Sequence, residues 1–287
     1  MLRFFHVDVF APRPFTGNGL GVFPDAGSLS AGQMQMLTQE LRQFECVFLI
    51  PTGEGAVRAR IFTMDEELPF AGHPLLGAGA VLHHLAGAQA ESVSAFELTG
   101  SRRLTVRSAR TGDAFLVEMD QGVATFGPTL EEGGVLAALG LQPDDLAPGL
   151  PLQVVSTGLP YLLVPLRRGL DQARILHTRF EGLLTDLGAK FIYLLDVETQ
   201  EGRTWDNRGA VEDVATGSAA GPAAAYLVRH GRASAEGWMT LAQGRFAGRP
   251  SELHMRVGAS GKVVVRGLVF VLGEGHLASP PHPVKTG

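Results

Sequence analysis

Two short segments of the sequence combine groups that could bind an anion with a side chain that could donate a hydrogen bond. His73 follows Gly72 at the start of one apolar segment, and Ser218 follows Thr216 and Gly217 at the start of another. The first turn of a helix offers unpaired backbone N–H groups and the positive end of the helix dipole. Glycine lets a ligand approach that backbone closely. We therefore predict that the two segments bind a carboxylate. The alternative is that Thr216 or Ser218 only caps its helix and that His73 is a satisfied, partly buried histidine.

Two carboxylates are candidates for proton transfer. Glu45 lies at the start of the apolar run Phe44–Ile50, where desolvation by apolar neighbours would raise its pKa. A carboxyl group tuned towards neutrality suits general acid–base catalysis. Asp213 lies five residues before Ser218. The alternatives are a strand-edge charge facing water for Glu45 and an ordinary turn aspartate for Asp213.

Other residue patterns give little support to metal, phosphate or hydrolase chemistry. The adjacent His83 and His84 cannot share a helical face, and the single cysteine, Cys46, cannot form a cysteine-rich zinc site. The segment Gly17–Gly21 lacks the final glycine of a dinucleotide-binding loop, and we predict a tight turn there. The residues around Ser218 do not match the Gly-x-Ser-x-Gly elbow of hydrolases. We expect no metal site.

Two apolar segments, Pro74–Leu82 and Ala219–Val228, must form helices that are buried on every side. Short β-type runs dominate the remaining sequence, and a sheet curled around each helix is the simplest way to enclose it. The small residues Gly77 and Gly79 would let strands approach closely. We therefore predict an α+β fold of two lobes, each a mostly antiparallel barrel around a central helix. The predicted strands are Phe4–Phe10, Cys46–Ile50, Val57–Phe62, Leu104–Val106, Phe115–Glu118, Leu152–Val155, Tyr161–Val164, Phe191–Leu195, Leu253–Val257, Lys262–Val265 and Leu268–Leu272. Peripheral helices are predicted at Ser30–Gln43 and Thr129–Leu139.

The approaches to the two buried helices repeat. An arginine leads to a glutamate, and a glycine follows the glutamate after five residues: Arg60, Glu67, Gly72 and Arg203, Glu212, Gly217. This spacing indicates two copies of one strand–turn–helix unit related by a pseudo-twofold axis. A site between the copies would receive both helix N-termini.

The length of 287 residues favours two domains. We place the boundary in the turn-type cluster Arg110–Asp113, which gives lobes of residues 1–112 and 113–287. The apolar strand Leu268–Leu272 is expected to return to the first lobe, and the proline-rich tail from Ser279 is expected to be disordered.

Composition excludes several classes of partner. A net charge of −5 with no cluster of Lys or Arg argues against nucleic acid. The most apolar window, Leu68–Leu82, contains His73 and is too short for a bilayer, so no membrane is expected. His6 and Asp8 interrupt the N-terminal apolar stretch that a secretion signal would need. A single cysteine suits the reducing cytoplasm.

Four motifs, in order and spacing, resemble the PhzF-like phenazine biosynthesis family. They are Val7–Phe10 with Phe15–Asn18, Glu67–Pro74, Glu212–Ala219, and Gln243-Gly244 with Gly248–Ser251. They span nearly the whole chain.

The resemblance implies a diaminopimelate-epimerase-like fold with the active site in the cleft between the lobes. It also implies a homodimer and an isomerisation by proton transfer without metal or organic cofactor. Carried over by motif, the catalytic residues are Glu45, His73 and Asp213, with Glu45 as the proton shuttle. The substrate-binding residues carried over are Asn18, Gly72, Thr216, Gly217 and Ser218.

The sequence departs from the family pattern around these residues. Arg42–Cys46 replaces Asn-x-Ser-Glu-Thr, Val214 replaces a proline, and Gly19 replaces the proline of Gly-Asn-Pro. The predicted substrate is therefore a small carboxylated molecule rather than the phenazine intermediate specifically. Two other functions stay open: an epimerase or racemase that uses carboxylates, since one cysteine cannot serve a two-cysteine mechanism, and a small-molecule-binding protein without turnover.

Overall fold

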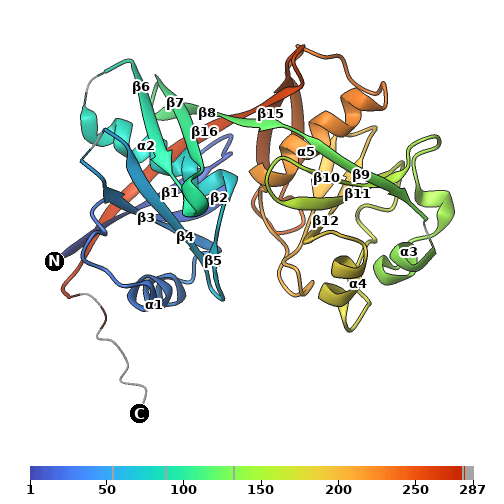
Figure 1. Ribbon diagram of the computed structural model, residues 1–287, viewed down its shortest axis with the longest axis horizontal. Helices are drawn as coiled ribbons and strands as arrows, with labels where there is room; N and C mark the ends of the chain where they lie inside the picture. Colours follow the sequence, from blue (N-terminus) through green and yellow to red (C-terminus); the bar gives the residue numbers. More distant parts are fainter. Residues whose placement is uncertain (54, 88, 132, 280, 282–287) are drawn as a thin grey trace. The chain divides into compact units, whose positions relative to one another are not determined.

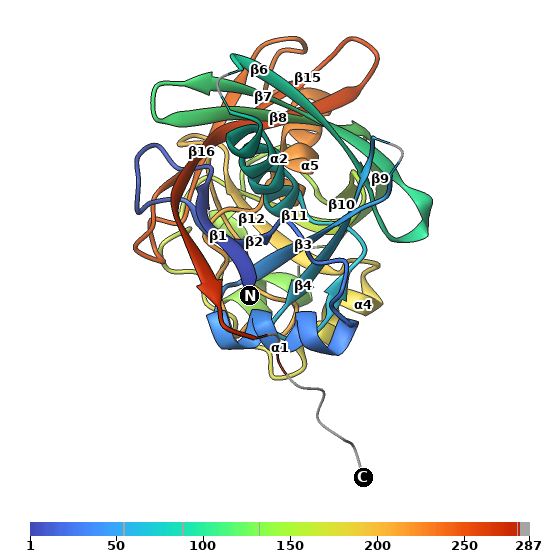
Figure 2. The same ribbon diagram turned by 90° about the vertical axis from the view of Figure 1, so that its left-hand side faces the viewer.

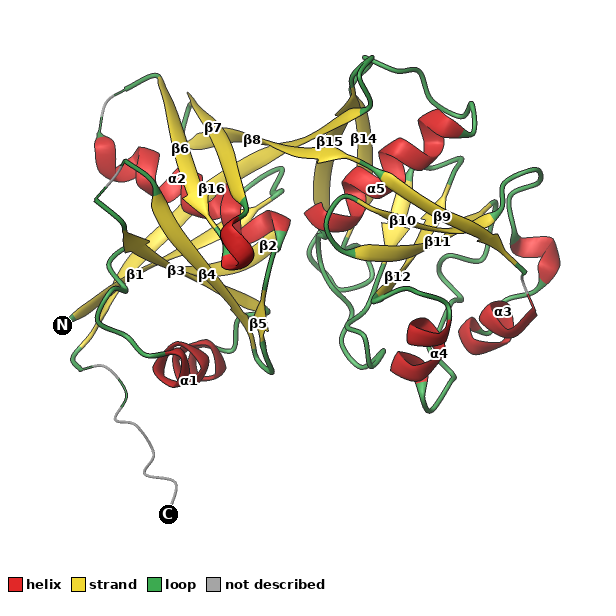
Figure 3. Ribbon diagram, in the orientation of Figure 1, coloured by secondary structure: helices red, strands yellow, loops and turns green. Residues whose placement is uncertain are grey.

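The computed structural model describes residues 1–53, 55–87, 89–131, 133–279 and 281, and the chain divides into two compact units. Unit 1 comprises Met1–Asp120 with Arg266–Gly287, and unit 2 comprises Gln121–Val265. Strands dominate both units, with few helices (Figure 3). The predicted α+β class is confirmed.

Unit 1 contains most of the N-terminal elements. They are β1 (Leu2–Val9), β2 (Asn18–Phe23), α1 (Ala31–Leu41), β3 (Glu45–Pro51), β4 (Val57–Thr63), β5 (Glu67–Leu68), α2 (Gly72–Ala86), β6 (Glu91–Glu97), the 3₁₀ turn η1 (Thr99–Ser101), β7 (Arg103–Thr111), most of β8 (Ala114–Val123) and most of β16 (Lys262–Leu277). Strands β8 and β16 each continue from one unit into the other.

The strands of unit 1 form a closed ring. Their order is β1-β2-β3-β4-β6-β7-β8-β16, and β16 pairs with β1 to close it. The pairs β1–β2, β3–β4, β6–β7, β7–β8 and β1–β16 are antiparallel, whereas β2–β3 and β4–β6 are parallel. Helix α2 runs among these strands (Figure 1, Figure 2), and Gly72–Val81 is buried throughout. This arrangement is the predicted barrel around an enclosed helix.

Two glycines make α2 narrow enough for the ring. A Cβ atom on Gly77 would lie 2.3 Å from Leu20 Cδ2, and one on Gly79 would lie 2.6 Å from Val106 Cγ1. Both distances are far inside van der Waals contact. The close packing of strand side chains against α2 therefore depends on glycine at these positions.

The outer face of the ring carries a second apolar layer. Helix α1 packs there with Met34 and Leu37 against Phe48 and Phe62. Ser30 caps α1 through a complete capping box with Gln33. Strand β3 is therefore buried on both faces, which explains its uninterrupted apolar run.

Unit 2 contains the remaining elements. They are β9 (Thr125–Leu130), α3 (Gly133–Leu139), the 3₁₀ turn η2 (Pro143–Asp145), β10 (Leu152–Ser156), β11 (Pro160–Leu166), α4 (Phe180–Asp186), β12 (Phe191–Asp196), β13 (Glu201–Arg203), α5 (Gly217–Arg229), β14 (Met239–Gln243) and β15 (Ser251–Val257).

The sheet of unit 2 repeats the plan of unit 1. Its strand order is β15-β14-β13-β12-β11-β10-β9, with β11–β12 and β13–β14 parallel. Helix α5 lies among these strands (Figure 1) and is buried from Gly217 to Leu227. The other face of the sheet packs through Leu162, Val164 and Ile192 against α3 and α4.

Some sequence expectations need correction. Gly17–Gly21 is not a tight turn, because Asn18–Phe23 forms β2, which pairs with both β1 and β3. Its glycines reflect crowding: a Cβ on Gly21 would lie 2.8 Å from Cys46 Sγ. The helix predicted at Thr129–Leu139 begins only at Gly133, because Thr129 and Leu130 belong to β9.

The domain boundary and the last strand differ in detail from the sequence prediction. The turn at Gly112 and Asp113, where the sequence suggests a domain boundary, joins β7 to β8 inside unit 1. Hairpin turns and linkers share the same residue types, which explains the ambiguity. Leu268–Leu272 and the run before it form one strand, β16, whose part from Arg266 belongs to unit 1. The tail after Ser279 lies outside the described residues, apart from Pro281.

A search of the described residues finds no helix long and apolar enough to cross a bilayer.

Replacing Gly79 with alanine tests the fit of α2. Overpacking against Val106 should cost about 1–3 kcal/mol, which outweighs the gain in helix propensity of about 1 kcal/mol. The control is Gly32→Ala in α1, where a Cβ meets nothing within 4 Å. Urea unfolding should rank Gly79→Ala below both the wild type and Gly32→Ala. Equal stabilities of the two variants would show that α2 is not tightly enclosed.

Candidate functional site

Glu45 is buried on the inner face of the unit 1 ring. It is the first residue of β3, it is 6% exposed, and it pairs in register with Leu20 of β2. Leu20 contacts the position of Gly77 in α2, so this face of the sheet looks towards α2. Glu45 is therefore not a strand-edge charge in water.

His73 lies beside Glu45. It is the second residue of α2 and 4% exposed, and its Nδ1 lies 3.5 Å from Glu45 Oε2. Burial lowers the pKa of His73 to about 3, so its ring is neutral at physiological pH. The other ring nitrogen, Nε2, is buried and has no hydrogen-bond partner among the described residues. A buried nitrogen in this state is a ready partner for a ligand.

The first turn of α2 has no side-chain cap. Its N-cap residue is Ala71, which carries no hydrogen-bonding side chain, and the helix begins at Gly72. The predicted residues Glu45, Gly72 and His73 thus come together at one uncapped helix start in unit 1.

Asn18 is placed by the same strands. It is the first residue of β2, 2% exposed, and it pairs with Val9 of β1. Because side chains alternate along a strand, Asn18 shares the inner face with Leu20, the register partner of Glu45. Asn18 therefore lies on the side of the sheet that faces α2.

In unit 2, Asp213 belongs to a closed hydrogen-bond network before α5. Its Oδ2 accepts a hydrogen bond from Thr216 Oγ1, and it is 6% exposed, unlike an ordinary turn aspartate. Gln243 Nε2 donates to Thr216 Oγ1 and to the Asp213 carbonyl, both at 2.9 Å. Gln243 Oε1 accepts from the Thr216 N–H at 3.2 Å and from Tyr193 Oη at 3.1 Å. This network fixes the chain that leads into α5.

Ser218 is the second residue of α5, the place that His73 occupies in α2. Its N-cap residue, Thr216, makes no side-chain cap hydrogen bond, because its hydroxyl already donates to Asp213. Ser218 Oγ lies 2.7 Å from Tyr161 Oη. Ser218 is therefore not a helix cap, and Asp213, Thr216, Gly217 and Ser218 gather at one helix start.

Sequence reasoning missed two residues of this region. Tyr161 lies on β11 and contacts Ser218 only in the folded chain, so the sequence around Tyr161 does not predict this contact. Gln243 belongs to the motif Gln243-Gly244, but its contacts with Thr216 and Asp213 form only in the folded chain, so the motif does not assign them.

The repeated arginine and glutamate residues form matching ion pairs. Arg60 binds Glu67 through two hydrogen bonds of 2.8 and 2.6 Å, and Arg203 binds Glu212 through two of 3.0 and 2.7 Å. The backbone matches as well, because Phe62 pairs with Glu67 and Trp205 bridges to Glu212. Each pair ties a strand to the turn that leads into the enclosed helix.

The side chain of Cys46 lies away from the start of α2. It follows Glu45 in β3 and so points to the opposite face, where it packs with the residues of α1. Burial raises the pKa of Cys46 to about 12, so a thiolate does not form at physiological pH. The polar side chains gathered at the two helix starts are therefore carboxyl, imidazole and hydroxyl groups. Within the described part of the chain, no three His, Cys, Asp or Glu residues are placed to hold a metal ion.

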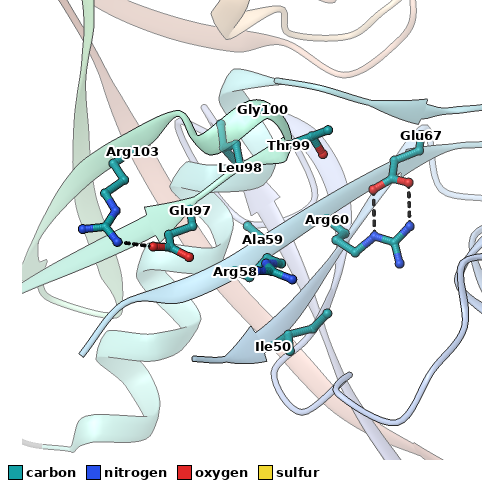
Figure 4. Close-up of a pocket in the computed structure, with 10 residues that line it drawn as sticks. All are labelled: Ile50, Arg58, Ala59, Arg60, Glu67, Glu97, Leu98, Thr99, Gly100 and Arg103. Carbon is teal, nitrogen blue, oxygen red and sulfur yellow. Dashed lines mark hydrogen bonds and ion pairs between the residues drawn. The ribbon is translucent and has the colours of Figure 1, made fainter. Parts of the chain in front are cut away.

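A pocket of about 530 Å³ lies elsewhere on unit 1. Figure 4 shows two ion pairs in its wall, Arg60–Glu67 and Arg103–Glu97. Its lining residues are Ile50, Arg58, Ala59, Arg60, Glu67, Glu97, Leu98, Thr99, Gly100 and Arg103. None of the residues predicted for the site lines this pocket, so it is separate from Glu45 and His73.

Comparison with known proteins identifies the family. The model of the phenazine biosynthesis-like protein family matches residues 7–275. The chain belongs to this family. The resemblance seen in the four sequence motifs is thereby confirmed.

Curated relatives of the family are isomerases. An isomerase from Escherichia coli O157:H7 named YddE, whose function is uncharacterized, is 31% identical over 93% of this chain and 95% of its own length. A trans-2,3-dihydro-3-hydroxyanthranilate isomerase from Pseudomonas aeruginosa is 34% identical over 92% of this chain and 93% of its own length. This chain is accordingly an enzyme of the isomerase and epimerase type.

Solved structures confirm the fold. The structure of a predicted epimerase, PA4716 from Pseudomonas aeruginosa, is 51% identical, covers 97% of this chain and 100% of its own, and superposes with a TM-score of 0.93. A probable proline racemase from Agrobacterium radiobacter has a TM-score of 0.64 at 15% identity, with 97% of this chain and 93% of its own covered. The second likeness extends to the fold alone, which is the epimerase-like architecture expected from the sequence.

The neutral state of His73 has a measurable consequence for stability. The folded-state pKa is lowered to about 3, while an unfolded histidine titrates near 6.5. As pH falls below about 6.5, the His73 ring binds a proton in the unfolded chain but stays neutral in the folded chain. His73 therefore contributes to a loss of stability between about pH 6.5 and 3, at up to about 1.4 kcal/mol per pH unit. Above about pH 6.5 the ring is neutral in both states, and none of this stability is lost.

Titration of the His73 ring by NMR checks this directly. The ring signals should remain those of a neutral imidazole down to about pH 5. A titration midpoint near 6.5 would mean that His73 is solvated and not buried beside Glu45.

Proposed function

We propose that this protein is a cofactor-independent isomerase that moves a proton on a small carboxylated substrate, with Glu45 as the proton shuttle. The observation that carries the proposal is the buried pair of Glu45 and a neutral His73 at the uncapped start of α2. A carboxyl group removed from water and beside a neutral imidazole can change its protonation state at moderate cost.

The proposed reaction balances without a co-reactant. The Glu45 carboxylate takes a proton from a substrate carbon, and the electron pair of the broken C–H bond shifts along the substrate. The resulting carboxylic acid then donates a proton to another carbon, and because its O–H hydrogen exchanges with water, part of the delivered hydrogen comes from the solvent. Substrate and product are isomers, and Glu45 ends in its starting state.

His73 suits a supporting role in both steps. A neutral imidazole has one N–H donor and one acceptor nitrogen. In the tautomer with its hydrogen on Nδ1, the ring donates towards the Glu45 carboxylate and Nε2 accepts a hydrogen bond from the ligand. The ring keeps its own hydrogen while Glu45 carries the transferred proton. The 3.5 Å separation is longer than a typical hydrogen bond, and loose contacts of this kind commonly shorten when substrate binds.

The helix starts supply binding for the substrate carboxylate. Helices α2 and α5 both begin without a side-chain cap, so their first N–H groups are available to an anion. We propose that Gly72, Gly217 and Ser218 bind the carboxylate and that Asn18 contacts the substrate beside Glu45. Thr216, whose N–H and hydroxyl donate to Gln243 and Asp213, lines the substrate at the start of α5, and Asp213 holds it there. That one substrate molecule engages both helix starts is part of this proposal.

The relatives suggest where to look for the substrate. Trans-2,3-dihydro-3-hydroxyanthranilate, the molecule in the name of the 34% identical isomerase, carries a carboxylate on a ring. It is the first compound to test, followed by other small carboxylates. The changed residues beside Glu45, such as Gln43 and Phe44, make a different substrate of this class an expected outcome.

Replacing Glu45 with glutamine tests the proton shuttle. Wild-type protein in D₂O should exchange a carbon-bound proton of its substrate for deuterium, measured by mass spectrometry. Glu45→Gln keeps the shape of the side chain but cannot accept the proton, so exchange should fall by about 10²–10⁴-fold. Asp213→Asn should lower exchange of the same substrate.

The adjacent residue provides a matched control for this experiment. Cys46→Ala changes a side chain on the opposite face of β3 and should retain exchange, with thermal melts confirming that each variant folds. Exchange retained in Glu45→Gln would remove Glu45 from the mechanism. Binding of the substrate without any exchange in the wild type would favour the non-catalytic function, and an inverted stereocentre in the product would favour the carboxylate epimerase.

A further inference from the structure

The contact between Tyr161 and Ser218 repeats, with different chemistry, the contact between Glu45 and His73. Tyr161 Oη lies 2.7 Å from Ser218 Oγ, and the two residues are 3% and 6% exposed. Ser218 and His73 are both the second residue of an enclosed helix. In each unit, the side chain at that place meets a polar group from the surrounding strands.

Strand register identifies the equivalent positions in the two units. Arg60 pairs with Phe48 across β3–β4, and Arg203 pairs with Leu194 across β12–β13. Phe48 and Leu194 are therefore equivalent positions in the two units. Glu45 lies three residues before Phe48, and Phe191 lies three residues before Leu194. Phe191 in unit 2 thus corresponds to Glu45 in unit 1.

The next strand gives the equivalent of Tyr161. Leu20 lies beside Glu45 in the parallel pair β2–β3, and Tyr161 lies beside Phe191 in the parallel pair β11–β12. In unit 1 the polar partner of the helix residue is on β3, whereas in unit 2 it is on β11, the strand beside the one that corresponds to β3. Phe191 stacks against the Tyr161 ring at a centroid distance of 5.4 Å, which holds the phenol in place.

The remaining hydroxyl of this helix start is already committed. Thr216 Oγ1 donates to Asp213 Oδ2 and accepts from Gln243 Nε2. Its only proton is thus used within the protein. Between Thr216 and Ser218, only Ser218 can still offer a hydroxyl proton to a ligand, and it can do so only if Tyr161 donates to it rather than accepting from it.

We infer that Tyr161 is a positioning residue that directs the Ser218 hydroxyl towards the carboxylate of the substrate. Tyr161 O–H donates to Ser218 Oγ, and Ser218 O–H donates to a carboxylate oxygen at the start of α5. Two hydrogen bonds in series polarise each other, so the second is strengthened by the first. The partner is a carboxylate because an acceptor oxygen is what this arrangement and the N–H groups of the helix start both require. The inference rests on the proposed function, since it specifies how the same substrate is held.

Tyr161→Phe tests the inference because it removes one oxygen and keeps the stacked ring. The probe is 3-hydroxyanthranilate, the aromatic counterpart of the molecule named for the relative, with its affinity measured by calorimetry. Loss of the aligned hydroxyl should weaken binding about tenfold, the range for one charge-assisted hydrogen bond. In the exchange assay, KM should rise by a similar factor while kcat changes less, because Glu45 is untouched.

A double-variant cycle separates positioning from structural support. Ser218→Ala should weaken binding at least as much as Tyr161→Phe, and the double variant should bind no more weakly than Ser218→Ala alone. Tyr226→Phe is the control, because Tyr226 Oη also makes a hydrogen bond in unit 2, to the Pro151 carbonyl at 2.6 Å. Tyr226→Phe should lose about as much thermal stability as Tyr161→Phe, while its affinity for 3-hydroxyanthranilate stays at the wild-type value.

The outcomes distinguish this inference from the proposed function. Wild-type affinity in Tyr161→Phe, or additive losses in the double variant, would overturn the role of Tyr161 even if exchange proceeds. Binding that depends on Tyr161 in a protein without deuterium exchange would support the carboxylate site and overturn the proposed isomerase activity. Absence of wild-type binding both to 3-hydroxyanthranilate and to the other small carboxylates tested would overturn the inferred carboxylate site.

Discussion

Enclosing a helix within a ring of strands imposes two demands on the same segment. The helix must be narrow, because strand side chains pack against it on every side, and Gly77 and Gly79 meet this demand in α2. Its first turn must also find partners for backbone N–H groups that have none within the helix. In α2 and α5 no capping side chain fills that role. The packing constraint thus creates, in each unit, a buried and electropositive helix start suited to an anionic ligand.

The two units support this feature in the same way and use it differently. In both, a doubly hydrogen-bonded arginine–glutamate pair ties a strand to the turn before the helix. In unit 1 the second residue of the helix is His73 and its partner is a carboxyl group. In unit 2 it is Ser218 and its partner is a phenol. The first pair joins a carboxyl group to an imidazole, whereas the second joins two hydroxyl groups that donate and accept hydrogen bonds. In the proposed function, unit 1 therefore transfers the proton and unit 2 contributes to substrate binding.

Alternation along β3 decides which chemistry is available. Glu45 points to the inner face, and Cys46, the next residue, packs under α1 with its thiol pKa raised to about 12. A fold shared with a probable proline racemase therefore carries no usable thiol here. This arrangement agrees with membership of the phenazine biosynthesis-like family and with relatives that are isomerases.

The sequence by itself determined the enclosed helices, the repeated Arg–Glu–Gly spacing and the residues that start each helix, because these depend on local periodicity and short spacing. Tertiary structure alone decided which side chains meet. The sequence predicts a turn at Gly17–Gly21, but pairing with β1 and β3 makes most of it a strand in which Cys46 leaves no room for a side chain at Gly21. Tyr161 reaches Ser218, and His73 reaches Glu45, only through strand register and the path of the enclosed helices. Register depends on long-range pairing, and a shift of one residue would turn each of these side chains to the opposite face. For that reason the sequence could nominate the groups, and only the folded sheet could assign their partners.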